Sequence, residues 1–265
     1  MDLGFRGKTA LVTGAGSQVG FGKEIALLLA KEGCVEVAVS DISLEDVEKT
    51  AEAVKKLGCK CFAFKADITN HAEVNAMIKK VIEKYGKIDI LCNVAGAILH
   101  KDNVPLDQQD DAVWAKQINL NLFGTMNVTQ AVLPHMREKK YGVVVNIGSG
   151  STHQYSMGVG MYAISKAAID LFTKQLATAE ARAGIRVNCV APGPAPTNFG
   201  AVLREGLPPS TPEQMQKGRE RMAAAFPLGR IGTAADIANA TVFLASDVTS
   251  YVTGQIFHVS GGSVM

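Results

Sequence analysis

The amino-acid sequence predicts an α/β fold in which about seven parallel strands form one doubly wound sheet with helices on both faces. Short apolar segments alternate along the chain with longer amphipathic segments, and this alternation is typical of consecutive βαβ units. The short segments are continuously apolar, as strands buried on both faces require. We expect residues 1–265 to form a single domain, because α/β folds of roughly 250 residues often form one unit.

Seven segments have the length and the apolar composition of strands. We expect these strands near 8–13, 35–40, 60–65, 88–93, 142–148, 185–191 and 255–259. Amphipathic segments of helical length separate them, near 22–32, 44–57, 71–85, 110–139, 160–183 and 233–245. Ser43 with Asp46, and Asn70 with Glu73, provide capping pairs at the start of the second and third helices.

A long stretch rich in proline and glycine interrupts this alternation before the last helix. A loop of such length inside a compact domain is usually functional. Thr211, Pro212 and Gln214 combine a proline at the first helical position with a capping box, and they predict a helix near 212–225. We therefore expect residues 194–226 to form a lid over the substrate site.

Composition and charge exclude several classes of protein. The chain has 27 Lys or Arg against 25 Asp or Glu, so its net charge of +2 does not favour nucleic-acid binding. No apolar run approaches the ~20 residues of a membrane-spanning helix, and the N-terminus lacks the pattern of a secretion signal. The five cysteines have no Cys-x-x-Cys spacing, which indicates reduced thiols rather than disulfides or a zinc site. We expect a cytoplasmic protein without a metal, nucleic-acid or membrane partner.

A glycine-rich turn follows the first expected strand. Gly14, Gly20 and Gly22 lie between that strand and the next helix, where glycines allow a tight turn and a close approach of phosphate oxygens to backbone N–H groups. The N-terminus of the helix then faces a pyrophosphate with the positive end of its dipole. The turn therefore predicts a dinucleotide site in a Rossmann-type domain.

Asp41 ends the second expected strand, 19 residues after Gly22. At this position an acidic side chain accepts hydrogen bonds from the ribose hydroxyls at the adenine end of the cofactor. The alternative is a capping role, because a helix follows Asp41. Neither the turn before Gly20 nor the two residues after Asp41 contain Lys or Arg to meet a 2′-phosphate. The sequence therefore favours NAD over NADP.

Three polar residues indicate proton transfer. Tyr162 and Lys166 are four residues apart at the start of a long expected helix, so they share one helical face. Free tyrosine has a pKa near 10, but a nearby ammonium and a cationic nicotinamide ring would stabilise its phenolate form. Ser149 ends the preceding strand, where its hydroxyl could hold a substrate oxygen beside Tyr162. Each residue alone has an ordinary explanation on a surface helix or loop.

Together with the glycine turn, these residues make the sequence resemble the short-chain dehydrogenase/reductase family over essentially its whole length. The family's Ser, Tyr and Lys match Ser149, Tyr162 and Lys166, with the usual 13-residue interval from Ser to Tyr. Its catalytic Asn, three residues before a glycine, matches Asn121. The family's cofactor-binding elements match Asp67 and Ile68 at the adenine, Asn93, Ala95 and Gly96 in an Asn-Val-Ala-Gly segment, and Pro192, Gly193 and Thr197 near the nicotinamide.

The sequence departs from the family pattern at two points. The glycine turn is two residues longer than the usual Thr-Gly-x-x-x-Gly-x-Gly, which leaves open which backbone amides bind the phosphates. We place Ser17 and Gln18 of this turn among the candidate cofactor-binding residues. Val94 replaces the second Asn of the family's Asn-Asn-Ala-Gly, a position that usually supports the fold.

The resemblance implies an NAD-dependent oxidoreductase that transfers hydride between a secondary alcohol, or a hydroxyacyl thioester, and its ketone. Tyr162 would act as the general base or acid, and Lys166 would bind the nicotinamide ribose. Asn121 would retain a water that links Lys166 to solvent. The alternatives are a 3-oxoacyl thioester reductase that uses NAD(P)H, an enoyl reductase, whose Tyr-to-Lys interval is usually longer, and a non-catalytic NAD-binding subunit.

The resemblance also implies assembly as a homotetramer or a homodimer, because relatives commonly pair two long helices across a twofold axis. The matching segments are 110–139 and 160–183, with Trp114, Met126 and Phe172 as candidate contact residues.

The substrate is expected to be a small molecule of a class that these motifs do not define. Its expected lining is mixed in character and consists of Ile98, His100, Gly150, Ser151, Gln154 and Met157. A coenzyme A thioester is one candidate, because residues 198–230 carry five Lys or Arg against three Glu.

Overall fold

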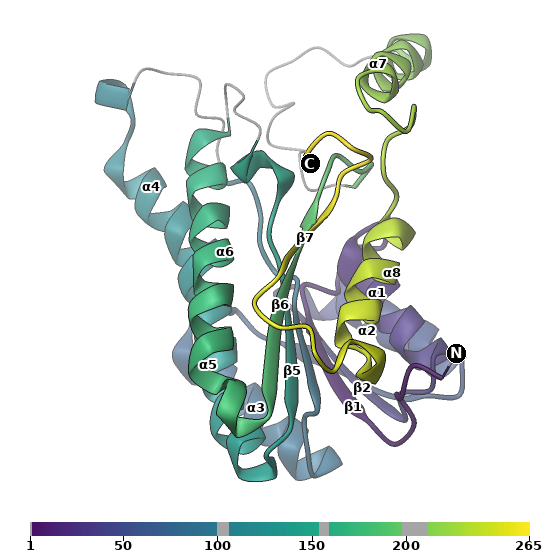
Figure 1. Cartoon of the computed structure of the whole chain (residues 1–265), viewed down its shortest axis with the longest axis vertical. Coiled ribbons are helices and arrows are strands. Elements are labelled where there is room, and N and C mark those ends of the chain that lie inside the picture. The colour runs from purple at the N-terminus through teal and green to yellow at the C-terminus, as the bar shows by residue number, and fades with distance from the viewer. Residues whose placement is uncertain (1, 100–105, 154–158, 198–210) are drawn as a thin grey trace.

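The computed structural model describes residues 2–99, 106–153, 159–197 and 211–265. Strands in this part of the chain form one parallel sheet of seven strands in the order β3-β2-β1-β4-β5-β6-β7 (Figure 1). The strands are β1 (Thr9–Thr13), β2 (Glu36–Asp41), β3 (Lys60–Lys65), β4 (Ile90–Asn93), β5 (Gly142–Ile147), β6 (Ile185–Pro192) and β7 (Ile256–Val259). The chain reverses its direction of travel across the sheet between β3 and β4, which is the doubly wound arrangement that the sequence predicts.

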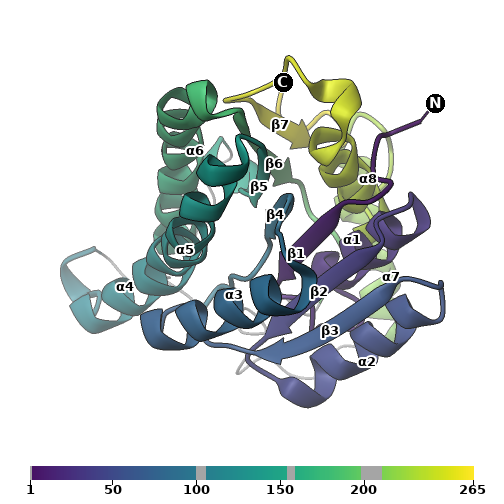
Figure 2. The same ribbon diagram turned by 90° about the horizontal axis from the view of Figure 1, so that it is seen from below.

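Helices cover both faces of the sheet (Figures 1 and 2). One face carries α1 (Phe21–Lys31), α2 (Leu44–Lys55) and α8 (Ala234–Ala245). The other carries α3 (His71–Tyr85), α5 (Gly124–Lys139) and α6 (Gly160–Glu180), with α4 (Asp111–Ile118) packed against α6. The remaining helix, α7 (Pro212–Ala224), lies beyond the carboxyl ends of the strands in Figure 1. No helix in these described ranges is long and apolar enough to cross a membrane.

Each face of the sheet has its own apolar core. Ile25 and Leu29 of α1 are fully buried against one face, in a cluster that also contains Leu244 of α8. Ile78 of α3 and Val132 of α5 belong to the cluster on the other face. Burying one such side chain contributes about 1.5–3 kcal/mol, so these two clusters are the main source of stability.

The segment 110–139 differs from the single helix that the sequence predicts. A π-helical turn over Asn119–Phe123 separates α4 from α5. In this turn the buried Asn121 side chain faces inward, where Oδ1 accepts from the Ala97 N–H at 3.0 Å and Nδ2 donates to the Ala97 carbonyl oxygen at 3.1 Å. Thr125 Oγ1 donates to the Asn121 carbonyl oxygen at 2.8 Å. Turns of this type often mark functional sites, and hydrophobic periodicity does not reveal them.

The expected helix starts are present. Ser43 Oγ accepts from the backbone N–H of Asp46, and Asn70 Oδ1 accepts from that of Glu73. Thr211 begins α7 with a complete capping box, as the sequence predicts. Residues 198–210 of the expected lid lie outside the described part of the chain.

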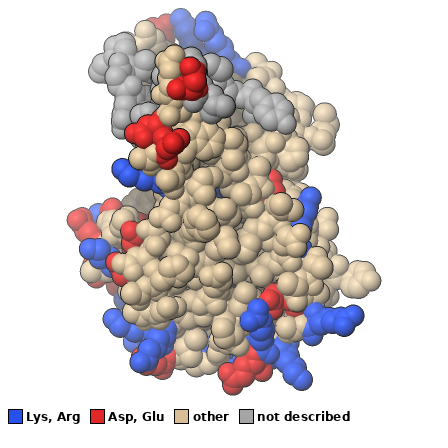
Figure 3. Space-filling model, turned by 90° about the vertical axis from the view of Figure 1, so that its left-hand side faces the viewer, with Lys and Arg blue, Asp and Glu red and all other residues tan. Residues whose placement is uncertain are grey.

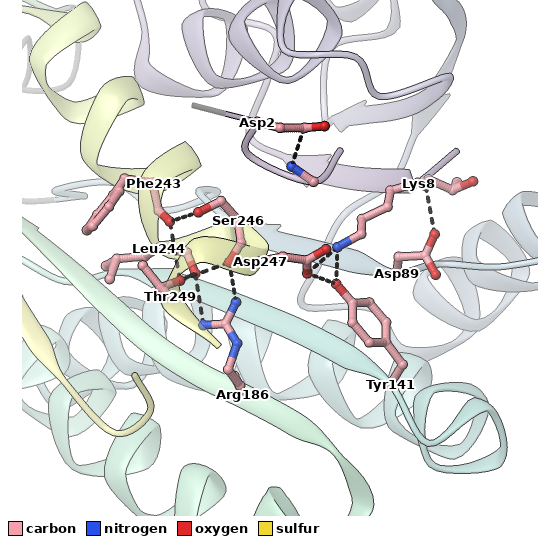
Figure 4. Close-up of polar contacts among 12 residues, drawn as sticks. Asp2, Lys8, Asp89, Tyr141, Arg186, Phe243, Leu244, Ser246, Asp247 and Thr249 are labelled. Carbon is pink, nitrogen blue, oxygen red and sulfur yellow. Dashed lines mark hydrogen bonds and ion pairs between the residues drawn. The ribbon is translucent and has the colours of Figure 1, made fainter. Parts of the chain in front are cut away.

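A polar network joins the chain at the amino ends of the strands, opposite the expected site (Figure 4). The Lys8 ammonium contacts both Tyr141 and Asp247, and Tyr141 Oη donates to Asp247 Oδ1 at 3.0 Å. Burial, together with the Asp247 carboxylate, raises the pKa of Tyr141 above its usual range. The network therefore holds the start of β1, the start of β5 and the segment after α8 together.

Arg186 at the start of β6 supports the same edge through bonds to the carbonyl oxygens of Leu244, Ser246 and Val252, at 2.8 to 3.1 Å. Replacing Arg186 with Met should lower the free energy of unfolding by about 2 kcal/mol or more, because partly buried carbonyl groups lose their donors. Urea unfolding followed by circular dichroism measures this loss. Lys60→Met removes one exposed ion pair and is the control, with an expected change below ~0.5 kcal/mol. Equal losses in the two variants would contradict this role of Arg186.

Candidate active site

The glycine turn begins at the carboxyl end of β1. Gly14 has a φ of +66°, and a Cβ at this position would lie 2.6 Å from the backbone of Ala95. A Cβ on Gly22 would lie 2.3 Å from the Gly14 carbonyl oxygen. Gly20 is the N-cap of α1 and provides no side-chain hydrogen bond to the first turn of that helix. The turn therefore needs glycine at these positions and forms a cradle beside the helix N-terminus that suits cofactor phosphates.

The two extra residues of the turn have different surroundings. Ser17 Oγ is buried and finds no hydrogen-bond partner among the described residues, so it suits a phosphate ligand. Gln18 Nε2 donates to the carbonyl oxygens of Gly16 at 2.7 Å and Asp46 at 3.0 Å, and Gln18 Oε1 accepts from Lys23 Nζ at 3.1 Å. The Gln18 side chain therefore fastens the turn to α2. Lys23 belongs to α1, yet its ammonium reaches this turn. A count of charges over the turn alone therefore misses this cation.

Asp41 lies at the end of β2, directly beside the turn. Its Oδ2 accepts from the Gly16 N–H at 2.8 Å, and its Oδ1 accepts from the Ser43 N–H at 3.3 Å. A Cβ on Gly16 would lie 2.6 Å from Asp41 Cγ, so glycine is needed here for the carboxylate to approach the turn. The same carboxylate is thus placed both for the expected ribose contact and for ordering the backbone before α2.

Asp67 and Ile68 follow β3 along the same edge of the sheet. Asp67 Oδ1 accepts from both the backbone N–H and the hydroxyl of Thr69, each at 2.8 Å. Ile68 is buried, and its carbonyl oxygen accepts from Asn127 Nδ2 at 2.9 Å. A Cβ on Gly124 would lie 2.6 Å from Ile68 Cδ1. The segment is therefore held rigidly where the sequence places the adenine.

Asn93 ends β4 with its amide enclosed in the protein. Its Nδ2 donates to Asn146 Oδ1 and to Thr129 Oγ1, each at 2.9 Å. Asn146 Nδ2 in turn donates to Thr173 Oγ1 at 2.9 Å. This buried chain of amides and hydroxyls joins the two central strands to α5 and α6. Asn93 thus supports the expected cofactor site from within the core.

Ala95 and Gly96 continue the chain from β4 toward the catalytic residues. The backbone N–H of Ala95 donates to Thr13 Oγ1 at 3.2 Å, which ties this segment to the end of β1. A Cβ on Gly96 would lie 2.8 Å from Asn121 Oδ1 and 3.3 Å from Lys166 Nζ. Glycine at this position therefore lets the backbone approach two catalytic candidates.

Pro192 and Gly193 close the site on the side of β6. The Gly193 N–H donates to the Val259 carbonyl oxygen at 2.9 Å, and a Cβ on Gly193 would lie 2.8 Å from Ser260 Cα. Thr197 follows four residues later, beside residues outside the described part of the chain. The described geometry thus fixes the backbone of Pro192 and Gly193 at the carboxyl end of β6.

The four catalytic candidates converge beyond the carboxyl end of β5. Tyr162 is buried and hydrogen-bonded to the Ser149 side chain. Lys166 is 3% exposed, its Nζ donates to the Ile147 carbonyl oxygen at 2.8 Å, and it lies 5.9 Å from the centre of the Tyr162 ring. Asn121, in its π-helical turn, completes the group against the backbone near Gly96. The structure therefore brings together all four residues that the sequence selects.

Burial dominates the electrostatics of this group. It raises the pKa of Tyr162 far above its usual range, and the hydrogen bond with Ser149 opposes this effect only in part. Burial lowers the pKa of Lys166 to about 8. The Lys166 ammonium, which the sequence predicts to lower the Tyr162 pKa, is directed at the Ile147 carbonyl oxygen. In the protein alone Tyr162 is a phenol at neutral pH, and it needs further positive charge nearby to accept a proton.

Part of the expected substrate lining is also present at this end of the sheet. Ser151 Oγ donates to Ser149 Oγ at 2.9 Å, and Gly150 follows Ser149 in the same short turn. Ile98 is 9% exposed and lies just beyond the segment that contacts Asn121. The other expected lining residues, His100, Gln154 and Met157, lie outside the described part of the chain.

Proteins of known sequence match this chain over almost its whole length. A sequence model of the family described as Enoyl-(Acyl carrier protein) reductase matches residues 14–263. A 3-oxoacyl-(acyl-carrier-protein) reductase of Thermotoga maritima is 38% identical over 259 residues, which cover 98% of each chain. The (2S)-((R)-hydroxy(phenyl)methyl)succinyl-CoA dehydrogenase subunit BbsD of Thauera aromatica is 38% identical over 262 residues, again 98% of each.

Solved structures share the fold at similar identity. A 7α-hydroxysteroid dehydrogenase complexed with NADH and 7-oxo glycochenodeoxycholic acid is 37% identical with a TM-score of 0.87, and the match covers 99% of this chain and 96% of that one. A gluconate 5-dehydrogenase from Burkholderia cenocepacia in complex with NADP and tartrate is 30% identical with a TM-score of 0.86, over 99% and 97% of the two chains. These matches, with Ser149, Tyr162 and Lys166 assembled beside the glycine turn, show that the chain belongs to the short-chain dehydrogenase/reductase family and is an oxidoreductase.

Proposed function

We propose that this protein is an NAD-dependent dehydrogenase that interconverts a secondary alcohol, or the hydroxyl of a hydroxyacyl thioester, and the corresponding ketone. The observation that carries the proposal is the buried Tyr162 phenol, hydrogen-bonded to Ser149 and adjacent to Lys166, at the sheet edge where the glycine turn lies. The names of the relatives support an interconversion of a hydroxyl group and a ketone. They include a 3-oxoacyl reductase and a hydroxysteroid dehydrogenase.

The bound nicotinamide would accept hydride from the alcohol carbon or return it to the ketone. Ser149 and Tyr162 would hold the substrate oxygen between their hydroxyl groups. In oxidation the Tyr162 phenolate accepts the hydroxyl proton, and in reduction the phenol donates it. Lys166 would bind the nicotinamide ribose, and its charge near the phenol favours the phenolate form.

Asn121 would serve this proton transfer indirectly. Its Nδ2 donates to Ser165 Oγ at 2.9 Å, and its backbone carbonyl oxygen accepts from Thr125 Oγ1 at 2.8 Å. We propose that Asn121, held in this geometry, retains the water that connects Lys166 to solvent.

Replacing Tyr162 with Phe should lower kcat by about 10²–10⁴-fold, because the group that transfers the proton is removed. The assay follows NAD reduction over secondary alcohols, cyclic alcohols and 3-hydroxyacyl thioesters. NADH binding, measured by fluorescence titration, should change less than about twofold. Tyr85→Phe is the control and should retain full activity, because Tyr85 belongs to α3 and its Oη has no hydrogen-bond partner among the described residues. Full activity in the Tyr162 variant would refute the proposed role.

Asp41 supports the choice of NAD over NADP. A 2′-phosphate at the end of β2 would meet this carboxylate, and the cation on the same side of the turn, Lys23, contacts Gln18. The relatives include one structure complexed with NADH and another with NADP, so the choice depends on the residues of each chain. We propose that the Asp41 carboxylate hydrogen-bonds the ribose diol and repels a 2′-phosphate.

Asp41→Ala should therefore raise KM for NAD and reduce the ratio of kcat/KM for NAD to that for NADP by about tenfold, equivalent to ~1.4 kcal/mol. Steady-state kinetics with both cofactors measure the ratio. Glu45→Ala removes one exposed carboxylate from α2 and should leave the ratio unchanged. A wild-type enzyme that prefers NADP would show that this interpretation of Asp41 is wrong.

The reduction of a 3-oxoacyl thioester with NAD(P)H is a second candidate function. It is favoured by the name of the Thermotoga maritima relative and by the charge of α7, where Lys217, Arg219 and Arg221 are exposed. Lys217 pairs with Glu213 at 2.8 Å, and Glu220 lies between the two arginines along α7, so three basic against two acidic residues leave a net charge of +1 for an anionic thioester. We propose that residues 194–226 close over such a substrate as a lid. The three residues between Tyr162 and Lys166 argue against enoyl reduction.

The unpaired cysteines support a place in the cytoplasm. All five are free and buried in the structure. Unpaired cysteines are usual in compartments that are kept reducing, where disulfides rarely form. We therefore propose a cytoplasmic protein in which residues 1–265 form one domain.

The helix face formed by α4, α5 and α6 supports assembly with further copies of the chain. Figure 3 shows this face with charged side chains gathered toward its two ends and an uncharged band between them. Ile164 and Leu171 of α6 are 52% and 60% exposed. Trp114 and Phe172, two of the expected contact residues, are partly exposed on neighbouring parts of the face. We propose that two copies pair across this face, in a homodimer or as half of a homotetramer.

Leu171→Glu should disrupt this pairing, because it places a charge in the centre of an apolar contact. Light scattering at micromolar concentration should give a multiple of the 28.0 kDa monomer mass for the wild type and a lower mass for the variant. Leu57→Glu, at an exposed leucine after α2 in the other layer, should leave the mass unchanged. A wild-type mass of one monomer would contradict the proposal.

A further inference from the structure

A polar cluster lies behind Lys166, outside the set of residues that the proposed mechanism uses. It is formed where α6 packs against β6, β7 and the short turn after Ser149. Its members are Thr152, His153, Asp170, Cys189 and His258. Asp170 is the acidic group of this cluster, and no sequence motif singles it out.

Asp170 lies one helical turn after Lys166. The two residues are four apart on α6, so their side chains project from the same face of the helix. Lys166 Nζ donates to the carbonyl oxygen of Ile147 at 2.8 Å. At the next residue, Gly148, a Cβ would lie 2.9 Å from Asp170 Oδ1. The ammonium and the carboxylate therefore approach consecutive backbone residues at the end of β5.

The Asp170 carboxylate is fixed by groups from other elements. Cys189 Sγ of β6 lies 3.6 Å from Asp170 Oδ1, and the Thr152 hydroxyl is hydrogen-bonded to the same carboxylate. Thr152 Oγ1 also lies 3.0 Å from the Ser149 carbonyl oxygen, so its single hydroxyl hydrogen is shared between two acceptors. The carboxylate is thus linked to the turn that carries the catalytic serine.

Two imidazoles lie near the Asp170 carboxylate. The rings of His153 and His258 are 4.7 Å apart in an edge-to-face arrangement. His258 Nδ1 is buried and has no hydrogen-bond partner among the residues that the structure describes. Burial raises the pKa of Asp170, and Thr152, Cys189 and both histidines oppose this shift.

Near pH 7 to 8, where histidine side chains are ordinarily neutral, Lys166 is the cation on the Asp170 face of α6. The Cys189 thiol also stays neutral, since burial raises its pKa above the usual range. Burial lowers the pKa of Lys166 to about 8, and the negative charge of Asp170 acts against this shift. Without Asp170, the ammonium would have no nearby carboxylate among these groups to compensate its burial.

We propose that Asp170 is a positioning residue for the proton-transfer site: its buried carboxylate keeps the Lys166 ammonium protonated and at the end of β5, beside Tyr162. The proposal rests on the proposed function in so far as Lys166 and Tyr162 act together. The effect of Asp170 on the charge of Lys166, however, is a property of the protein without substrate and can be measured separately.

The first experiment is an NMR titration of the lysine side chains of the full-length protein without ligands, from pH 5.5 to 11. Lys166→Arg assigns the Lys166 signal. Asp170→Asn should lower the Lys166 midpoint by about one pH unit or more, the order expected for the loss of a nearby charge at an effective dielectric constant near 20. Asp170→Glu should restore most of this shift. Glu45→Gln, on an exposed face of the other layer, should leave the midpoint unchanged.

The second experiment compares kcat/KM, which reports the ionisation of the free enzyme, over the same pH range. Because the lysine must be protonated to act, kcat/KM of Asp170→Asn should approach that of the wild type near pH 6.5 and fall about tenfold below it by pH 9. The alkaline limb should move by the same amount as the Lys166 midpoint. A residue that only helps α6 to pack would lower the melting temperature without moving either midpoint.

An unchanged Lys166 midpoint in the folded Asp170→Asn variant would overturn the proposal. Where circular dichroism shows that this variant is unfolded, Asp170→Ser provides the same test with a smaller neutral side chain. A shifted Lys166 midpoint together with full activity of Tyr162→Phe would refute the proposed function while leaving the electrostatic role of Asp170 in place. The two failures are therefore distinguishable.

Discussion

The hydrogen bond from the Lys166 ammonium to the Ile147 carbonyl oxygen is the contact on which the carboxyl edge of the sheet depends. A buried cation is costly unless a polar group receives it, and this bond of 2.8 Å supplies one. The bond requires α6 to lie close to the end of β5, and a Cβ on the neighbouring Gly96 would come within 3.3 Å of the same nitrogen. The packing that satisfies the lysine therefore also accounts for the glycine at position 96. It places Tyr162, one turn earlier on α6, against Ser149.

Rigidity at this edge comes from a buried polar chain rather than from apolar packing alone. Asn93, Asn146 and Thr173 connect β4, β5 and α6 through bonds of 2.9 Å, and Thr129 adds α5 to the same chain. The Nδ2 groups of Asn93 and Asn146 each reach buried acceptors, and donors held in this way admit few alternative arrangements of the backbone. The distance between the glycine turn on β1 and the catalytic residues after β5 is thus fixed by the core. Side chains held in this way keep the reacting groups within the small deviations of distance and angle that proton and hydride transfer require.

The parts of this molecule that the sequence predicts are those governed by local rules. The alternation of buried strands and amphipathic helices identifies the sheet, and the spacing of Tyr162 and Lys166 identifies one helical face. The π-helical turn at Asn121 escapes such reasoning, because apolar periodicity continues through 110–139 while the backbone widens. The inward contacts of Gln18 and the approach of Asp170 to the end of β5 also escape it. Each of these three features depends on which distant element packs against the residue. Local sequence patterns do not indicate such long-range packing.

The electrostatics of the site link the binding of cofactor to the chemistry of Tyr162. In the protein alone, burial holds the tyrosine in its phenol form and weakens the proton affinity of the neighbouring lysine. Both shifts oppose a phenolate, so the isolated site is a proton donor and a poor base. Positive charge brought to the same enclosed space acts strongly on the phenol, because little water is present to screen it. Burial makes Tyr162 inactive as a base in the free protein. The same burial makes the proton affinity of Tyr162 sensitive to the charge of an oxidised nicotinamide. Oxidation of an alcohol should therefore proceed only after that cofactor is bound.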